Sequence, residues 1–404
     1  MYTESEVLDF VKEEDVRFVR LAFFDITGRQ KNISIMAGEL ERAFRDGIAF
    51  DASAVKGFEN PNRSDLFLHP EPATLAVLPW RPMTGKVIRL FCGIKYPDGT
   101  PYEYDSRYIL QKAVEKAKAE AGIEFKFGTE IEFYLFQLDQ NGNPSKVPFD
   151  QAGYMDIAPD DKGENIRRDI CFTLEQMGII PEASHHEEGP GQNEIDFHYS
   201  DPVSAADNNS TFKWIVRTKA FGNGLCADFS PKPIADEAGS GMHINLSYKV
   251  PEKEDRPEIF DYIIGGILNN IKDMTYFLNP SRQSYLRLGE FKAPKYIAYG
   301  RENRSTCLRI PATKGDRRIE IRSPDPACNP YIAYTLLIYA ALDGIKNKSI
   351  PPKEVTENLF DSDSAASLKL DLLPSTLEKA HKNAAASKFI TTYLGKEFIK
   401  KYGI

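Results

Sequence analysis

The sequence lacks the features that mark several classes of protein. Its five cysteines are odd in number and include no C-x-x-C pair, so zinc ribbons and redox dithiols have no support, and we expect reduced thiols. The longest apolar run, 330–342, falls well short of the roughly 20 residues that a membrane span needs, and is better explained as a buried helix. Neither a G-x-x-x-x-G-K-[ST] loop nor a G-x-G-x-x-G fingerprint occurs, so any nucleotide is held by another architecture.

Basic residues are also in deficit. The chain has 51 Lys and Arg against 59 Asp and Glu, a formal net charge of −8. This balance argues against general binding to nucleic acid or to an anionic membrane, and we expect neither as a partner. The first residues show no basic region followed by an apolar stretch, so no secretory signal is expected and the predicted location is cytoplasmic.

The remaining composition is that of an ordinary globular protein, with 42% hydrophobic and 27% charged residues. Short β-rich runs and one helical stretch in the first hundred residues predict a small α+β domain over 1–98. Turn residues at 97–99 mark its end. Over 99–404, long helical stretches alternate with short strands, which predicts an antiparallel sheet backed by helices. The polar tract 361–367 is expected to be a surface loop.

Two glutamates share one face of a predicted strand, 128–136. Glu130 and Glu132 are alternate residues, so their Cα atoms are roughly 7 Å apart. At that separation and an effective dielectric near 20, their repulsion is about 2 kcal/mol, which a bound divalent cation turns into attraction. The alternative is a half-exposed strand with solvated acids, and this motif alone does not decide between them.

Further acids and one histidine lie on other predicted strands. A Gly-Pro-Gly turn separates Glu187 from Glu194, and His243 shares a strand face with Asn245 and Ser247. A neutral imidazole can complete a carboxylate metal site. A hydrogen-bonded core histidine is the alternative for His243 by itself. The repetition of acids and a histidine on strand faces favours a metal centre.

The strongest local signal is the segment Arg318-Ile-Glu-Ile-Arg322, in which Glu320 lies between two arginines on one strand face. If Glu320 binds a metal, these arginines are placed to hold the anionic oxygens of an ATP phosphate or a substrate carboxylate. A structural ladder of salt bridges is the alternative. Arg304 and Arg309 add two cations nearby, which makes a phosphate-rich ligand reasonable.

Together, these segments resemble the glutamine synthetase family, in particular its type I class, of which the chain looks like a short member. The resemblance covers nearly the whole chain and rests on five motifs in the family's order: Gly128-Thr-Glu-Ile-Glu132, His186-Glu187 with Gly191-Gln-Asn-Glu194, Gly239-Ser-Gly-Met-His243, Asn303-Arg-Ser305 and Arg318-Ile-Glu-Ile-Arg-Ser-Pro-Asp-Pro326. It implies an α+β fold of the glutamine synthetase/guanido kinase-like type. A small N-terminal β-grasp domain would precede a large C-terminal catalytic domain.

The resemblance also implies an activity, an ATP-dependent carboxylate–amine ligase that works through a γ-glutamyl phosphate-type intermediate. The implied cofactors are ATP and two or three Mg²⁺ or Mn²⁺ ions. The implied ligands of the metal ions are Glu132, Glu187 and Glu194 for one ion, and Glu130, His243 and Glu320 for another.

Other matched positions imply contacts with the substrates. Those on the amino-acid side are Glu132, Gly239, Arg287, Arg304 and Arg322. Those on the nucleotide side are Asn245, Ser247, Arg309 and Arg318. Those with catalytic roles are Asp51, Arg304 and Lys292. In this family the aspartate matched by Asp51 crosses to a neighbouring subunit's site, so a homo-oligomer, a hexameric ring or a dodecamer, is implied.

Two departures from the family pattern bear on the amine. Lys292 stands where the family has a flap glutamate that helps collect the ammonium proton, and a protonated lysine repels ammonium and cannot be its base. Ala238 replaces an asparagine that helps hold the substrate's α-amino group. Both favour an amine other than ammonium or an altered acid. The alternatives are authentic glutamine synthesis, with Glu290 as the base, and a catalytically inactive sensor or structural homologue.

Overall fold

The computed structural model describes residues 2–58, 61–251, 256–313 and 317–403. Contacts divide the chain into two compact units. The first contains residues of Met1–Lys112, Thr173–Ile179 and Glu397–Ile404, and the second contains residues of Ala113–Phe172 and Ile180–Lys396. These units are defined by packing alone, and the domain boundary between residues 98 and 99 stays a prediction.

The first unit is built on a small mixed sheet with the strand order β2-β1-β6-β4-β3 and with β5 added to β6. Strands β1 and β6 are parallel, and the other described pairs are antiparallel. The strands are β1 (Val16–Phe24), β2 (Gln30–Met36), β3 (Ile48–Asp51), β4 (Asp65–Pro70), β5 (Ala76–Val77) and β6 (Lys86–Lys95). This is the predicted β-grasp domain.

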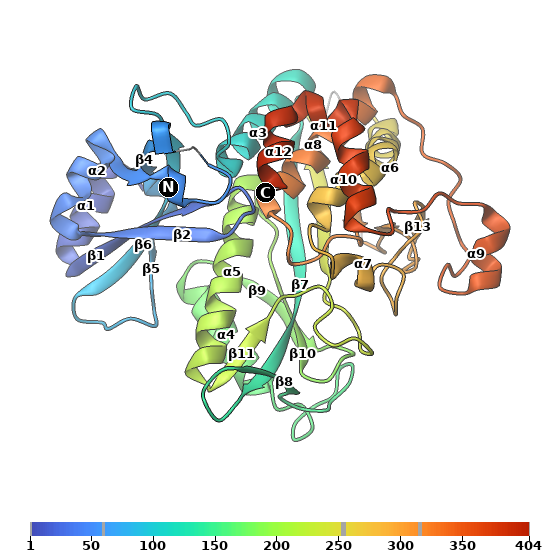
Figure 1. Ribbon diagram of the computed structural model, residues 1–404, viewed down its shortest axis with the longest axis horizontal. Helices are drawn as coiled ribbons and strands as arrows, with labels where there is room; N and C mark the ends of the chain where they lie inside the picture. The colour runs from blue at the N-terminus through green and yellow to red at the C-terminus, as the bar shows by residue number, and fades with distance from the viewer. Residues whose placement is uncertain (1, 59–60, 252–255, 314–316, 404) are drawn as a thin grey trace. The chain divides into compact units, whose positions relative to one another are not determined.

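Two helices, α1 (Glu4–Glu13) and α2 (Leu40–Asp46), belong to the same unit (Figure 1). Helix α1 begins at a capping box, in which Thr3 and Glu6 satisfy each other's backbone amides. Helix α2 ends at Gly47, whose φ of +74° suits glycine. The short 3-10 turns are η1 (Ala37–Glu39), η2 (Ala52–Ala54), η3 (Pro61–Arg63) and η4 (Pro72–Thr74).

The second unit is built on a larger sheet with the order β13-β14-β15-β12-β7-β10-β9, with β8 and β11 added to β7. Its described pairs are antiparallel apart from β13 and β14, so the predicted antiparallel sheet is mixed at one edge. The strands are β7 (Glu124–Leu138), β8 (Pro144–Pro148), β9 (Pro181–His186), β10 (Gln192–Phe197), β11 (Leu225–Asp228), β12 (Met242–Lys249), β13 (Tyr299–Arg301), β14 (Leu308–Ile310) and β15 (Arg318–Ile321).

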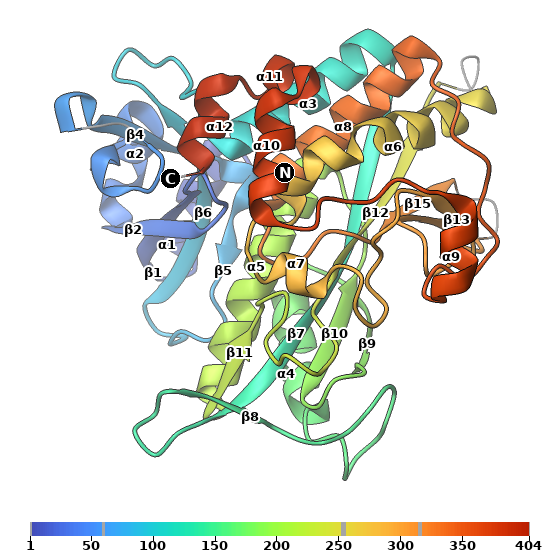
Figure 2. The ribbon, with the colours of Figure 1, turned by 45° about the vertical axis from the view of Figure 1, so that its right-hand side comes forward.

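The long strand β7 lies at the centre of this sheet, with β12 beside it (Figure 2). Helices back the sheet as predicted, and Phe127 of β7 stacks on Tyr334 of helix α8 at 4.4 Å between ring centroids. The second unit contains α5 (Pro202–Gly222), α6 (Glu258–Leu278), α7 (Ser284–Arg287), α8 (Pro330–Asn347), α9 (Ser362–Leu368), α10 (Leu377–Ala386) and α11 (Lys388–Tyr393). Helices α3 (Ser106–Ala121) and α4 (Glu164–Gln176) are each divided between the two units, and α12 (Lys396–Tyr402) belongs to the first unit apart from its first residue.

Helices α6 and α8 pack closely because glycines meet between them. A Cβ on Gly344 would stand 2.0 Å from the Tyr262 carbonyl oxygen and 2.8 Å from the Gly266 Cα atom. Helix α8 is buried along most of its length, which confirms the buried helix predicted over 330–342. No helix in the described ranges is long and apolar enough to cross a membrane.

The expected surface loop over 361–367 is wrong, because helix α9 occupies most of it. The Asp361 side chain caps this helix by accepting a hydrogen bond from the Ser364 amide. Asp and Ser favour helix N-caps as well as loops, so composition alone did not separate the two. All five cysteines are free thiols, as expected.

Candidate functional site

The register of four strands brings the candidate metal ligands together. Strand β7 carries Glu130 and Glu132 on one face. On one side of β7, His243 of β12 is the register partner of Glu130, and on the other side Glu194 of β10 is the partner of Glu132. Strand β15 follows β12 and adds Glu320. The candidate ligand side chains of the four strands therefore lie on one face of the sheet.

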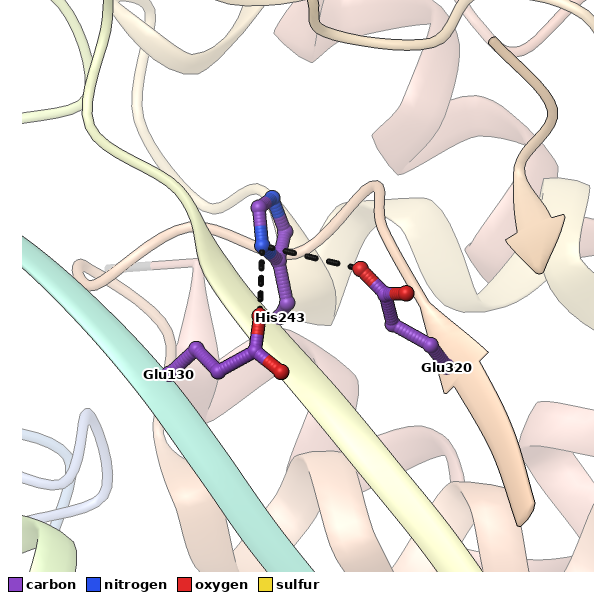
Figure 3. Close-up of side chains that lie close together, drawn as sticks. All are labelled: Glu130, His243 and Glu320. Carbon is purple, nitrogen blue, oxygen red and sulfur yellow. Dashed lines mark hydrogen bonds and ion pairs between the residues drawn. The ribbon is translucent and has the colours of Figure 1, made fainter. Parts of the chain in front are cut away.

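Glu130, His243 and Glu320 point toward one another from three neighbouring strands (Figure 3). His243 Nδ1 lies 3.3 Å from a Glu130 oxygen and 3.8 Å from a Glu320 oxygen. Burial opposes the charge on Glu130, but hydrogen bonds from His243 and Asn245 and the charge of His243 outweigh it and lower its pKa to about 2. This trio is the set that the family resemblance implied for one ion.

The other implied trio is arranged differently. Glu132 and Glu194 group with His243, whereas Glu187 and Glu194 group with His185, so Glu194 is shared by both groups. His185 Nε2 lies 2.9 Å from a Glu187 oxygen. His185 was not among the sequence candidates, although it precedes Glu187 by two residues in a strand-like segment.

The donor set fits divalent cations. Burial raises the pKa of Glu132, and it raises that of Glu194 well above the usual value, helped by repulsion from Asp196 and Glu132. Burial and the charge of Glu130 likewise raise the pKa of Asp196 to about 7. In each group the ligand atoms lie within 4.8 Å of one another. Carboxylate oxygens with one imidazole are donors that Mg²⁺ and Mn²⁺ accept.

Arginines surround these acids. The two oxygens of Glu320, a fully buried side chain, accept hydrogen bonds from Arg322 at 2.6 Å and from Arg309. Arg287 is also buried, and its guanidinium donates to the carbonyl oxygens of Ser323 at 2.9 Å and of Arg322 at 3.3 Å. Arg287 is therefore held rigidly by the main chain with part of its donor capacity left for a ligand.

Two cavities open on the cluster. The larger, about 420 Å³, is lined by the substrate-side candidates Glu132, Gly239, Arg287, Arg304 and Arg322, by Lys292, and by most of the metal candidates. The smaller, about 220 Å³, is lined by three of the four nucleotide-side candidates, Asn245, Ser247 and Arg318. Arg309 instead pairs with Glu320. Glu130 and Asp196 line both cavities, so the two spaces share a wall.

Asp51 belongs to the first unit, at the end of β3. Its exposed carboxylate accepts hydrogen bonds from the Ser53 amide at 2.9 Å and the Ser53 hydroxyl at 2.6 Å. Its role in amine binding stays a prediction.

Contacts of His186 and Gly189 fix the turn between β9 and β10. The buried His186 ring bonds the Asp150 carboxylate at 2.9 Å and the Glu187 carbonyl at 2.7 Å. A Cβ on Gly189 would stand 1.9 Å from the Tyr134 hydroxyl, so the Gly-Pro-Gly turn needs its first glycine. These contacts hold Glu187 and Glu194 on either side of the turn.

Several lining residues were missed from the sequence. Gln192 donates to Glu132 at 3.0 Å and to the Gly239 carbonyl at 3.3 Å, which orients an acid of the site. Asp196 alternates with Glu194 on β10, so strand periodicity could have found it. The others are Tyr154, His185, Glu188, Phe291 and Ala293, whereas Glu290, the alternative base considered from the sequence, also lines the cavity.

Comparisons with known proteins place this geometry in context. The family model for the catalytic domain of glutamine synthetase matches residues 103–403, and the model for its β-grasp domain matches residues 15–97. The glutamine synthetase of Methanosarcina mazei is 43% identical, with 99% of this chain and 92% of that protein covered. That of Staphylococcus aureus is 40% identical, with 99% and 93% covered.

Solved structures are similar over almost the whole chain. The GmaS/ADP complex has a TM-score of 0.88 at 26% identity, with 98% of this chain and 93% of that chain covered. Glutamine synthetase of Plasmodium falciparum has a TM-score of 0.86 at 24% identity, with 100% and 94% covered, which shows the fold.

Proposed function

Because the chain belongs to the glutamine synthetase family of ATP-dependent ligases that form amide C–N bonds, we propose that it joins a glutamate-type carboxylic acid to an amine other than ammonium. One observation carries the proposal. Acids, a histidine and arginines from four strands converge where two cavities share a wall. Such an arrangement suits transfer of a phosphoryl group from a nucleotide in one cavity to an acid in the other.

The chemistry proceeds in two steps. A carboxylate oxygen of the acid attacks the terminal phosphorus of ATP, the bond to the bridging oxygen breaks, and ADP leaves with that electron pair. The neutral amine nitrogen then attacks the acyl carbon, forming the C–N bond as the C–O bond to phosphate breaks. The proton lost by the nitrogen leaves with phosphate as HPO₄²⁻. Positioning and charge stabilisation supply most of the catalysis in such transfers.

The chain's own residues would hold the reactants. Arg287, which the main chain fixes, would bind the acid's distal carboxylate, while Arg322 and Arg304 would face the reacting carboxyl and the transferred phosphate. Asn245, Ser247 and Arg318 would contact the nucleotide from the smaller cavity. Arg309 would act through Glu320.

The family uses ATP and divalent cations, and the residues present fit them. We assign the trio of Figure 3 to one cation, and Glu132, Glu187 and Glu194 to another, within a total of two or three Mg²⁺ or Mn²⁺ ions. When bound, such cations offset the negative charge of phosphate oxygens. The carboxylates provide the affinity, because their mutual repulsion is relieved by a positive charge.

The amine side supports a departure from ammonium. Lys292 lines the larger cavity, where its positive charge disfavours a small cation. Ala238 lines the same cavity and offers no side-chain hydrogen bond, although its carbonyl accepts one from Tyr134 at 2.5 Å. Authentic glutamine synthesis is the second candidate, supported by the relatives at 40–43% identity that are named glutamine synthetase.

The test measures ADP and phosphate release with Mg-ATP over a panel of carboxylic acids crossed with ammonium and primary amines, with mass spectrometry of the products. Turnover that requires both an acid and an amine supports the ligase. The variant Glu130→Gln should lose this turnover, whereas Glu124→Gln, exposed at the start of β7, should keep it. Binding of Mg-ATP without turnover for any pair would refute the ligase and favour the inactive homologue.

A double variant tests whether the amine is ammonium or another amine. If only specificity has changed, Lys292→Glu combined with Ala238→Asn should bring ammonium-dependent glutamine formation. If the wild type prefers ammonium to the other amines, the proposal of a different amine is refuted, whereas the proposed ligase activity is not.

We also propose that the protein is a homo-oligomer, a hexameric ring or a dodecamer. Light scattering of the protein as it elutes from a size-exclusion column measures its mass and tests this.

A further inference from the structure

Exposed cations line the mouth of the larger cavity, whereas buried acids line its interior. Lys292 is the only lysine among the described residues that line this cavity, and its side chain is 60% exposed. Its ammonium group forms an ion pair with Glu188 and lies 5.7 Å from the centroid of the Tyr154 ring. Arg304, a second exposed cation, lines the same cavity. Two exposed cations, together with the exposed Glu290, therefore stand at an opening that leads to buried acids.

Aromatic side chains lie beside this positive charge. Tyr154 is 52% exposed and Phe291 is 49% exposed, and both line the cavity. Phe291 has a φ of +50°, a strained conformation for a bulky residue, directly before Lys292. Lys232 lies 4.3 Å above the Phe291 ring and helps to hold it there. The loop is thus built to present an apolar surface and a cation together.

The cavity therefore combines an exposed ammonium group and exposed aromatic rings with carboxylates that are buried. This combination is complementary to a short chain with a carboxylate at one end, methylene groups in the middle and an amine at the other end. We infer that the amine substrate carries an anionic group, which Lys292 binds in place of Glu188, so that the acceptor is an amino acid of the ω-amino carboxylate class. This inference rests on the proposed ligase function.

Glu188 then has a definite role. Its carboxylate is the partner of Lys292 when no acceptor is bound. An incoming carboxylate exchanges with Glu188 as the partner of Lys292 at little cost, because one exposed ion pair replaces another. An alkylamine of equal length, or ammonium, has no group to make this exchange.

The experiment compares amines matched in length, 3-aminopropanoate with propylamine and 4-aminobutanoate with butylamine, together with ammonium. Rates of ADP release are measured with Mg-ATP and the acid that supports turnover. The wild type should show kcat/KM roughly tenfold or more higher for the amino carboxylates, the usual range for one charge-assisted hydrogen bond. The higher kcat/KM should come from a lower KM for the amine.

Three variants test the residues. Lys292→Met should abolish the preference for the carboxylated amine, and Glu188→Gln should lower the KM of that amine severalfold because the competing partner is gone. Lys295→Met removes an exposed cation of the same segment that does not line the cavity, and should leave the preference unchanged. A purely structural role for Glu188 would not give a lower KM.

The outcomes separate this inference from the proposed function. Equal or better use of alkylamines or ammonium by the wild type overturns the inference and leaves the ligase standing. Unchanged preference in Lys292→Met also overturns it. Absence of turnover for every acid and amine, with Mg-ATP bound, refutes the ligase itself and the inference with it.

Discussion

Gly241 stands where three side chains of the site meet, so substituting it with alanine should impair the site without unfolding the protein. A Cβ there would lie 2.7 Å from Arg287 Nη2, 2.9 Å from His243 Nε2 and 3.2 Å from a Glu132 oxygen. Ordinary contact begins at 3.4 Å, so the guanidinium must move by about 0.7 Å and the imidazole by about 0.5 Å.

Neither group can move freely. Arg287 is fixed by two main-chain carbonyls, and His243 is 3.3 Å from Glu130. Since a misplacement of 1 Å can cost about 100-fold in rate, we expect Gly241→Ala to lower kcat/KM by roughly 10- to 100-fold. The assay is ADP release with Mg-ATP and the substrates used by the wild type, together with Mn²⁺ binding by titration calorimetry.

The control is Gly222→Ala, at a position where a Cβ would meet no atom within 4 Å. It should keep full turnover, and both variants should unfold within a few degrees of the wild type. Wild-type turnover and Mn²⁺ affinity in Gly241→Ala would refute the reasoning, because the three groups would then tolerate displacement. A large loss of stability would show instead that the added methyl disturbs the sheet.

Three further predictions concern stability. Gly344→Ala should destabilise the protein by about 1–3 kcal/mol in urea unfolding, because the new Cβ would meet the Tyr262 carbonyl between two packed helices. Burial raises the pKa of Asp105 to about 6, above its unfolded value of 3.8. The folded protein therefore keeps a proton that the unfolded chain has released, so stability should fall by about 3 kcal/mol as pH rises from about 4 to above 6. Urea titrations across this range should show that Asp105→Asn removes that slope, and an equal slope in the variant would contradict the assignment. Glu320→Gln should cost about 3–5 kcal/mol in metal-free buffer, because two arginines lose a buried counter-ion, and a loss below 1 kcal/mol by denaturation would show that they find other partners.

Much of the site was predictable because its residues lie on strands. The two-residue period places Glu130 with Glu132, and the register of β12 and β15 then adds His243 and Glu320, all of which had been singled out. The two-unit fold followed from runs of apolar residues and turn signals. The sequence did not reveal which strands pair, and the family resemblance supplied only which residues would share an ion.

Apart from Lys292 and Arg304, which the family resemblance singled out, the residues at the cavity mouth could not be found from the sequence. Tyr154 and Phe291 lie outside regular helices and strands, so no periodicity marks them. Glu188 and Lys292 are 104 residues apart, and their ion pair depends on the tertiary fold. Helix α9 was missed because its capping residues are also typical of loops.

The register of β7 with its neighbours has a consequence for refolding. Candidate ligands come from β7, β10, β12 and β15, and the first and last of these strands are nearly 200 residues apart in the sequence. Strands that are so far apart along the chain pair slowly. A slip of one residue in any pair would turn its ligand to the opposite face of the sheet. After dilution from denaturant, the helical circular dichroism signal should therefore recover first. The affinity for Mn²⁺ should recover later, when the last pair of strands has reached its correct register.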